Sequence, residues 1–262
     1  SRNGRHSIMI TFKNEFESHE HSLITLDQLY EYDSFLDSLT TIADFGCGTG
    51  RDVQWWANLM TRDDPPRPRN YKVYACDRAV DKLLDAEVRE YANVHPANID
   101  IDSDDPPLSV EVDFIWSHDT FQYVINPMRT LAAWNRQLVV NGMLMMVFPQ
   151  STYTKYGHEE VIYSASQMYY NHNLIHMVYM LAVNGFDCKD AYMKKDADDP
   201  WLHVAVYKSC EPMDPKTTTW FDLADKDLIN KTFVECLNKH SYIRQDKILT
   251  QWIDKGLYFN KR

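Results

Sequence analysis

The sequence predicts an α/β protein whose core is a doubly wound, mostly parallel sheet of seven strands with an antiparallel last strand. Three observations support this fold class. Strand-like and helical segments alternate through the middle of the chain, and a glycine-rich turn separates the first strand from the helix that follows it. The last two strand-like segments lie too close in sequence for a helical crossover, so we expect them to be antiparallel.

Residues 1–40 are expected to form an N-terminal arm and a helix, together acting like a lid. The first 22 residues are polar with scattered aromatic side chains. Between Thr25 and Leu39, apolar residues recur at helical spacing, and Thr25 with Gln28 suggests a capping box. A helix over this stretch would lead into the first strand, which begins at Thr41.

Residues 41–208 are expected to form one α/β domain. Pro127 suits the first turn of a helix, and the apolar run at 143–148 suits a strand that is buried on both faces. After the first strand, the expected elements are helix 51–60, strand 71–76, helix 79–91, a third strand ahead of residues 98–102, strand 112–116, helix 127–138, strand 143–148, helix 166–183 and strands 186–193 and 201–207.

Residues 209–262 are expected to form a C-terminal helical extension. A turn-rich linker at 210–215 precedes two helical patterns at 224–237 and 243–257. We expect this extension to pack on the α/β domain, or to mediate a homodimer or another partner contact.

Composition limits the classes of function. The 262 residues are 44% apolar and 25% charged, as in globular proteins. Five scattered cysteines without a C-x-x-C pair, and no recognisable signal peptide, predict a reducing, cytoplasmic compartment. The most apolar stretch, 138–148, is about half as long as a membrane span, so we expect no membrane segment. The net charge of −11 disfavours a nucleic-acid partner without excluding one.

The glycine turn carries the strongest functional signal. Residues 44–50 read Asp-Phe-Gly-Cys-Gly-Thr-Gly between a strand-like run and a helical stretch. Arg51 stands where a dinucleotide-binding turn would place its third glycine. The pattern resembles the first motif of the class I S-adenosylmethionine-dependent methyltransferases, and the order of elements is similar to that family over residues 42–208. The resemblance implies a Rossmann-like fold, S-adenosylmethionine as cofactor and methyl transfer as activity.

The resemblance also implies roles for the acidic residues at the strand ends. Asp77 ends the second strand, where the family's acidic residue accepts hydrogen bonds from both ribose hydroxyls, and Arg78 would lie beside the adenine. The alternative for Asp77 is a helix N-cap before Ala79. Asp44 should lie near the methionine end of the cofactor and orient its ammonium group. Cys47 fills a slot in which any small side chain suffices.

Further contacts are expected after the third and fourth strands. Asp100 would accept the exocyclic amine of the adenine, and Ile101 would pack on its ring, in a register uncertain by two residues. Ser117 and His118 follow the fourth strand, where the family's backbone and small side chains flank the transferred methyl group. The candidate cofactor-binding residues are therefore Asp44, Gly46, Cys47, Gly48, Gly50, Asp77, Arg78, Asp100, Ile101, Ser117 and His118.

His118 is the candidate general base, because histidine titrates near neutral pH and the strand order places it at the carboxyl edge of the sheet. A role in contacting the cofactor or in capping is an equally good interpretation. Tyr153 and Tyr156, in the loop after the fifth strand, are second catalytic candidates as walls of an acceptor pocket.

Other site chemistries lack support. The His172 and His176 pair, spaced by four residues, has no third ligand or H-E-x-x-H pattern, so we expect no metal. Two Asp-Pro-Pro segments, at 64–66 and 105–107, lie ahead of the fourth strand and lack the aromatic residue that stacks on a flipped base. No Pro-Cys nucleophile is present near that strand.

The sequence therefore predicts an S-adenosylmethionine-dependent methyltransferase that acts on an oxygen or nitrogen of a small molecule or a discrete residue. Three alternatives stay open: a cofactor-binding but inactive partner subunit, an RNA or nucleotide methyltransferase, and a nicotinamide-dependent oxidoreductase, which Arg51 disfavours. No motif identifies the acceptor.

Overall fold

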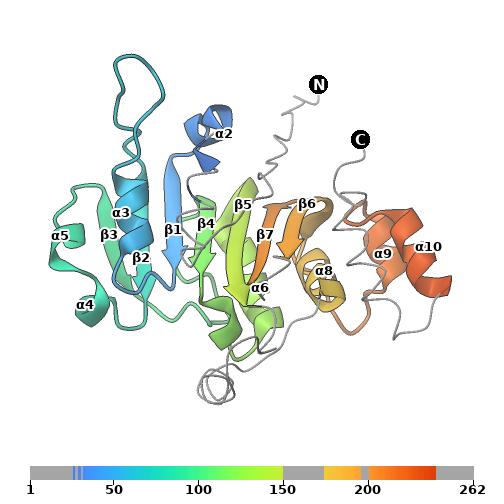
Figure 1. Cartoon of the computed structure of the whole chain (residues 1–262). Coiled ribbons are helices and arrows are strands. Elements are labelled where there is room, and N and C mark those ends of the chain that lie inside the picture. Colours follow the sequence, from blue (N-terminus) through green and yellow to red (C-terminus); the bar gives the residue numbers. More distant parts are fainter. Residues whose placement is uncertain (1–25, 27–28, 31, 150–173, 196–200, 240–262) are drawn as a thin grey trace, which may run out of the picture.

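The computed structural model describes residues 26, 29–30, 32–149, 174–195 and 201–239 of the 262-residue chain. Seven strands form one sheet in the order β3-β2-β1-β4-β5-β7-β6 (Figure 1). The strands are β1 (Thr41–Phe45), β2 (Lys72–Asp77), β3 (Val94–Asn98), β4 (Val112–His118), β5 (Leu138–Pro149), β6 (Phe186–Lys195) and β7 (Trp201–Lys208).

Strand directions confirm the predicted fold class. β1 to β5 pair in parallel, and β7 lies antiparallel between β5 and β6. Six strands therefore share one direction and the last strand opposes them. The chain winds outward from β1 through β2 to β3, then returns to β4 on the other side of β1, which is the doubly wound order.

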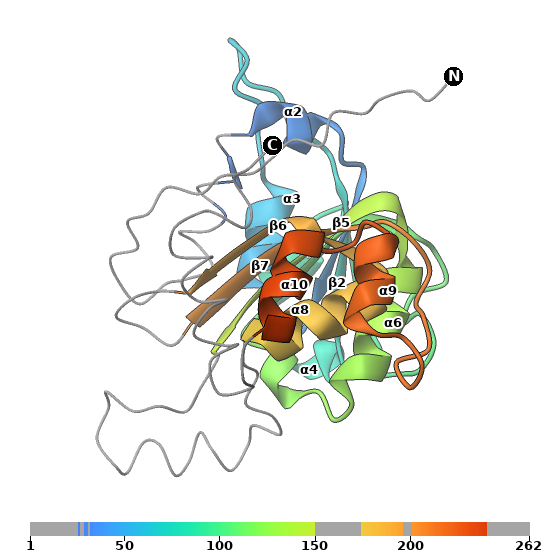
Figure 2. The same ribbon diagram turned by 90° about the vertical axis from the view of Figure 1, so that its right-hand side faces the viewer.

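Helices cover both faces of the sheet and bury two apolar clusters (Figures 1 and 2). Helices α3, α4 and α5 pack on one face, together with α2, whose residues Phe35 and Leu36 are buried there. Helices α6, α8, α9 and α10 cover the other face. Their bounds are α2 (Asp33–Asp37), α3 (Arg51–Ala57), α4 (Val80–Leu83), α5 (Ala86–Arg89), α6 (Pro127–Gln137), α8 (Leu174–Val183), α9 (Trp220–Asp225) and α10 (Lys231–Lys239), with a 3-10 turn η1 at Phe121–Tyr123.

Helix α6 shows how local sequence and core packing agree. Pro127 occupies its first turn as predicted, and the Asn126 side chain accepts a hydrogen bond from the Arg129 amide. The buried Trp134 packs edge-on against Phe45 of β1, with ring centroids 5.2 Å apart. Its indole N–H donates to the Ile101 carbonyl at 2.8 Å, so the ring is both buried and satisfied.

The prediction of one helix over 79–91 is wrong, because the chain forms two short helices there. Leu84 adopts an extended conformation between α4 and α5. The next amide, that of Asp85, donates to the Thr49 carbonyl in the glycine turn at 3.0 Å instead of continuing the helix. A tertiary contact with the turn therefore overrides the helical periodicity.

The predicted helix over 224–237 is also wrong. Thr219 and Asp222 form a capping box that starts α9 at Trp220, earlier than the apolar pattern suggested. Asp227 has a positive φ of 62° and separates α9 from α10. Both helices contribute to the cluster on the sheet through Leu223, Phe233 and neighbouring residues.

Residues 139–142 lie between the expected helix 127–138 and the expected strand 143–148, and they belong to the fifth strand. β5 begins at Leu138, directly after α6, and its register with β4 shifts between Val112 and Phe114. Asn141 has a φ of 63°, a left-handed conformation that asparagine tolerates. The Asn-Gly pair therefore makes a bulge within the strand.

The other boundaries differ by a few residues or cannot be compared. The helix that follows β1 ends at Ala57, three residues earlier than expected. In the expected helix 25–39, Leu26 and Leu29 are helical, and α2 begins separately at Asp33. The proposed capping residues Thr25 and Gln28, residues 166–173 and the expected helix 243–257 lie outside the described residues.

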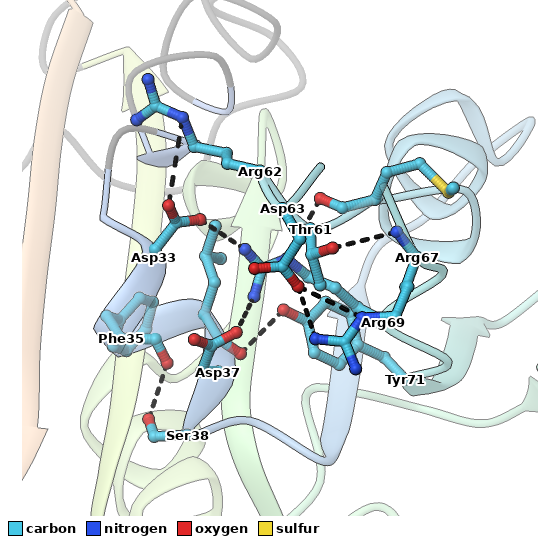
Figure 3. A network of polar contacts seen from close by, with 12 residues as sticks. Asp33, Phe35, Asp37, Ser38, Thr61, Arg62, Asp63, Arg67, Arg69 and Tyr71 are labelled. Atoms are coloured by element: carbon cyan, nitrogen blue, oxygen red, sulfur yellow. Dashed lines mark hydrogen bonds and ion pairs between the residues drawn. The ribbon is translucent and has the colours of Figure 1, made fainter. Parts of the chain in front are cut away.

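At the amino ends of the strands, Arg69 joins α2 to the loop before β2 (Figure 3). Its side chain is only 3% exposed, and the guanidinium group pairs with both Asp33 (2.5 Å) and Asp37. The Arg69 Nε–H donates to the Met60 carbonyl, and the Tyr71 hydroxyl donates to the Leu36 carbonyl at 2.8 Å. These contacts tie α2 to the edge of the sheet that lies opposite the glycine turn.

Replacing Arg69 with Met is expected to lower the free energy of unfolding by about 2 kcal/mol, because a shielded guanidinium loses two carboxylate partners and a carbonyl. The matched control is Arg67→Met, whose ion pair with Asp63 is exposed and should not contribute measurably. Urea unfolding of both variants checks this. Equal stability of the two variants would contradict it.

Candidate functional site

The carboxyl ends of β1, β2 and β4 form the candidate site. The chain leaves β1 toward β2 on one side and returns to β4 on the other, so the loops after these strands diverge around a crevice. Ligands of open α/β sheets bind at this switch point. Most of the site residues predicted from the sequence follow these three strands.

The turn after β1 depends on its glycines. Gly46, Gly48 and Gly50 have φ values of 84°, 51° and 90°, which side chains other than glycine rarely adopt. A Cβ atom at Gly46 would overlap Thr120, and one at Gly50 would overlap Leu84. The Gly46 and Cys47 amides both donate to the Cys76 carbonyl, at 2.8 and 3.1 Å, which fixes the turn against β2.

Gly48 differs from the other two glycines, because no atom of the described residues, apart from its chain neighbours, lies within 4 Å of the position that its Cβ would occupy. The positive φ explains why the residue is glycine, and packing does not. Its amide lies 3.4 Å from Asp77 Oδ2. The turn therefore presents open backbone beside a carboxylate, which is the arrangement that lets a ligand approach the chain closely.

Asp77 ends β2 and faces the turn. Its Oδ1 accepts a hydrogen bond from the Ala79 amide at 3.0 Å, which holds the loop after the strand. Helix α4 starts at Val80, and its N-cap residue, Ala79, makes no side-chain cap. The carboxylate thus stabilises the turn without capping the helix, and Oδ2 is aimed at the open glycine.

Asp44 lies beneath the turn. It is 2% exposed, and its Oδ2 has no hydrogen-bond partner among the described residues. Burial raises the pKa of Asp44 well above its ordinary value, and the carboxylates of Asp52 and Asp77 raise it further, while Arg51 opposes them. A buried carboxyl group without a partner is costly, so this oxygen marks a place where a donor or cation is missing.

The two residues expected beside an adenine contact each other. The Arg78 guanidinium pairs with Asp100 Oδ1 at 2.7 Å, and both side chains are about half exposed. Asp102 has a structural role instead, since it accepts hydrogen bonds from the Ile125 amide and the Thr130 hydroxyl and so links the loop after β3 to α6 and the residues before it. Arg78 and Asp100 are therefore the accessible charged pair at this corner.

Ile101 is buried in the core, on the cluster that α6 covers. Ile99 is the partly exposed isoleucine of this segment, and its amide donates to the Asp77 carbonyl at 3.1 Å. This difference falls within the two-residue uncertainty of the expected register. Ile99 is thus an additional candidate for contact with a ligand beside Asp77.

Ser117 and His118 end β4. Ser117 is buried, and its hydroxyl donates to the Phe45 carbonyl at 3.0 Å, so the side chain joins β4 to β1. His118 has 17% of its side chain exposed, and its Nε2 atom is buried. Its Nδ1 lies 4.0 Å from Asp52 Oδ2, a carboxylate to which the sequence reading gave no role.

Asp119 and Gln122 form a second polar pair just after β4. Asp119 has a φ of 51°, and its amide donates to the Val147 carbonyl at 2.8 Å. The Gln122 amide group donates to Asp119 Oδ1 at 2.5 Å, while Gln122 Oε1 is buried without a partner among the described residues. Burial raises the pKa of Asp119. Nothing in the sequence distinguished these residues from an ordinary loop.

The remaining sequence predictions fall outside or beside the site. Tyr153 and Tyr156 lie outside the described residues. Burial raises the pKa of the Cys47 thiol, which disfavours a reactive thiolate and suits a passive role in the turn. The described residues contain no group of three or more metal-ligating side chains. No helix in the same part of the chain is both long and apolar enough to cross a membrane.

Comparisons with known proteins agree with this geometry. Residues 43–144 match the family model of a methyltransferase domain. A search of curated protein sequences gives no significant match.

Several solved structures share the fold. The phosphoethanolamine N-methyltransferase 2 of Haemonchus contortus, solved with S-adenosyl-L-methionine, is 13% identical with a TM-score of 0.52 over 70% of this chain, which spans 52% of that protein. The [4+2]-cyclase SpnF is 14% identical with a TM-score of 0.52, covering 78% of this chain and 86% of its own. An S-adenosylmethionine-dependent methyltransferase from Mesorhizobium loti is 15% identical with a TM-score of 0.50, covering 70% and 99%.

The different surroundings of the glycines predict different stabilities. Gly48→Ala should cost about 1–2 kcal/mol of unfolding free energy, the strain of a left-handed residue in open space. Gly46→Ala should cost more, because its methyl group also overlaps Thr120. Asn141→Ala, which imposes a similar strain far from the turn, is the control for Gly48→Ala.

Chemical denaturation measures these differences. Adding Thr120→Ala to Gly46→Ala should recover part of the loss, because it removes two of the three overlapping atoms. Equal losses for Gly46→Ala and Gly48→Ala, or no recovery in the double variant, would contradict the packing of the turn.

Proposed function

We propose that this chain is a class I S-adenosylmethionine-dependent methyltransferase, which binds its cofactor over the glycine turn after β1 and transfers the methyl group to an acceptor bound beside β4. The acceptor atom is an oxygen or nitrogen of a small molecule or of a discrete residue. The whole reaction is a proposal, since likeness at 13–15% identity extends to the fold alone.

One observation carries the proposal: open backbone at Gly48 lies beside the Asp77 carboxylate, in a turn that follows the buried Asp44, whose Oδ2 has no partner among the described residues. S-adenosylmethionine has a vicinal diol on its ribose and an ammonium group on its methionine part. Asp77 can accept hydrogen bonds from the diol, because a carboxylate offers two oxygens. The Asp44 Oδ2 atom can receive the ammonium, which would supply its missing partner.

The adenine would lie beyond Asp77, toward the ends of β2 and β3. Arg78 and Asp100 are the accessible polar groups at that corner, and Ile99 offers the apolar contact that Ile101 was expected to give. Ser117 would act through its backbone, since its hydroxyl is committed to Phe45. Cys47 contributes a small buried side chain to the turn.

The bound sulfonium would supply an activated methyl group, so the protein mainly aligns the acceptor. Alignment can lower the barrier by about 7–11 kcal/mol. His118 would take the proton that an O–H or N–H acceptor loses, a contribution of about 10²–10⁴-fold when needed. Its place at the end of β4, next to a buried carboxylate, supports this role.

The binding test uses calorimetry with S-adenosylhomocysteine, the product form of the cofactor, and with NAD. We expect binding of the first and none of the second. Asp77→Asn should weaken binding about tenfold or more, because the amide loses the charge and one of the two acceptor oxygens. Asp81→Asn, which removes an exposed carboxylate on the adjoining helix α4, is the matched control.

Turnover is measured as transfer of labelled methyl groups from S-adenosylmethionine to the small-molecule and macromolecular fractions of a cell extract. His118→Gln should reduce the transfer while S-adenosylhomocysteine still binds. Absence of binding to the wild type would reject the proposed function. Binding without transfer to either fraction would favour a cofactor-binding subunit without activity.

Asp44→Asn is expected to stabilise the ligand-free protein near neutral pH and to weaken S-adenosylhomocysteine binding. The folded pKa of Asp44 is raised, so this group favours folding fully below its ordinary value of 3.8 and progressively less as pH rises through the folded pKa. The neutral amide removes that loss. Thermal unfolding at several pH values, with and without ligand, measures both effects.

Asp81→Asn again serves as the control, because an exposed carboxylate should leave the pH dependence unchanged. If Asp44→Asn and the wild type lose stability equally with rising pH, the buried carboxyl group of Asp44 is not the cause of that loss. Unchanged affinity for S-adenosylhomocysteine would remove Asp44 from the ammonium site.

A further inference from the structure

Asp52 is a buried carboxylate that the proposed function does not yet use. It lies in the first turn of α3, directly after the glycine turn, and is 7% exposed. Its Oδ2 accepts a hydrogen bond from the indole N–H of the buried Trp116 at 2.9 Å, and its Oδ1 accepts one from Arg51 Nε at 3.2 Å. Both oxygens are therefore held in a fixed orientation.

The same oxygen that accepts from Trp116 also faces His118. The distance from Asp52 Oδ2 to His118 Nδ1 is 4.0 Å. Trp116 and His118 are two residues apart on β4, so their side chains leave the same face of the strand. Their rings are nearly parallel, with an interplanar angle of 9° and centroids 6.5 Å apart. The indole thus fixes the carboxylate at the Nδ1 side of the imidazole.

The charges around this pair come from several elements. Asp44 on β1 interacts electrostatically with Asp52 and with Asp77 on β2. Arg51 on α3 is a nearby cation, which pairs with Asp52. Asp119 follows His118 directly, and burial raises its pKa. Among the described residues, carboxyl groups therefore outnumber cations at this edge of the sheet.

We infer that Asp52, anchored by Trp116, is a positioning residue that directs the Nδ1–H of His118 toward itself and leaves Nε2 as the proton acceptor. This inference rests on the proposed function. In the transfer step, the acceptor forms a bond to the methyl carbon while the carbon–sulfur bond breaks and its electron pair stays on sulfur. The acceptor's proton passes to Nε2, and the imidazolium is stabilised by the Asp52 carboxylate.

A purely structural role for Asp52 makes different predictions. Acidic residues are common in the first turn of helices, and the bond to Trp116 alone would join α3 to β4. Asp52→Asn preserves an oxygen acceptor for the indole but removes the charge. Trp116→Phe preserves the charge but removes the link between α3 and β4. The two variants therefore separate positioning of His118 from support of the fold.

The measurement is the titration of His118 by nuclear magnetic resonance in the full-length, ligand-free protein. Asp52→Asn should lower the midpoint of the His118 titration by about 1–3 pH units, because it removes a negative charge within 4–6 Å. Trp116→Phe should leave the midpoint above that of Asp52→Asn while lowering the thermal midpoint of unfolding. An equal His118 midpoint in the wild type and Asp52→Asn would overturn the inference.

A second measurement needs no variant that might misfold. The nitrogen chemical shifts of neutral His118 in the wild type should show the proton on Nδ1, and a proton on Nε2 would overturn the inference. Failure of the proposed function can be distinguished from failure of this inference. If the proposed function is wrong, the wild type does not bind S-adenosylhomocysteine, but the His118 titrations in the ligand-free protein are unaffected. Loss of that binding in Asp52→Asn with an unchanged His118 midpoint would assign Asp52 to the cofactor instead.

Discussion

The close approach of three chain segments at the glycine turn is the constraint on which the rest of the structure depends. Thr120, from the segment after β4, occupies the space of a side chain at Gly46, and Leu84, from the break between α4 and α5, occupies that of Gly50. Two turn amides share the Cys76 carbonyl of β2. The ends of β1, β2 and β4 are thereby fixed together, and Asp44, Asp77 and His118 acquire their positions from the backbone.

This arrangement gathers more negative than positive charge. Asp44 and Asp52 are buried beside the turn, with Asp77 at its rim, and Arg51 is the cation that acts on Asp44 there. Burying carboxylates is costly unless hydrogen bonds or cations compensate. Asp52 is compensated by Trp116 and Arg51. Asp44 is not, and the ammonium of the proposed cofactor is the group that would offset its cost.

Strands and the glycine turn could be predicted because short apolar runs bounded by turn residues leave few alternatives. The ends of helices could not be predicted where tertiary contacts determine them. The pattern at 79–91 is helical throughout, but Asp85 bonds to Thr49 and breaks it. Asp52 escaped notice because an acidic residue in a helix's first turn is ordinary in sequence. Its significance comes from Trp116, which is 64 residues away along the chain and reaches it only after folding.

The fold alone does not decide the reaction, because one of the similar structures is a [4+2]-cyclase and two are methyltransferases. The discriminating chemistry lies beside β4. A [4+2] cyclisation removes no proton, whereas transfer to an O–H or N–H acceptor leaves one to be taken up. His118 faces a fixed carboxylate, and Gln122 Oε1 is a buried acceptor without a donor among the described residues. A histidine beside a fixed carboxylate suits an acceptor that loses a proton, which is why methyl transfer and not cyclisation is the reaction proposed above.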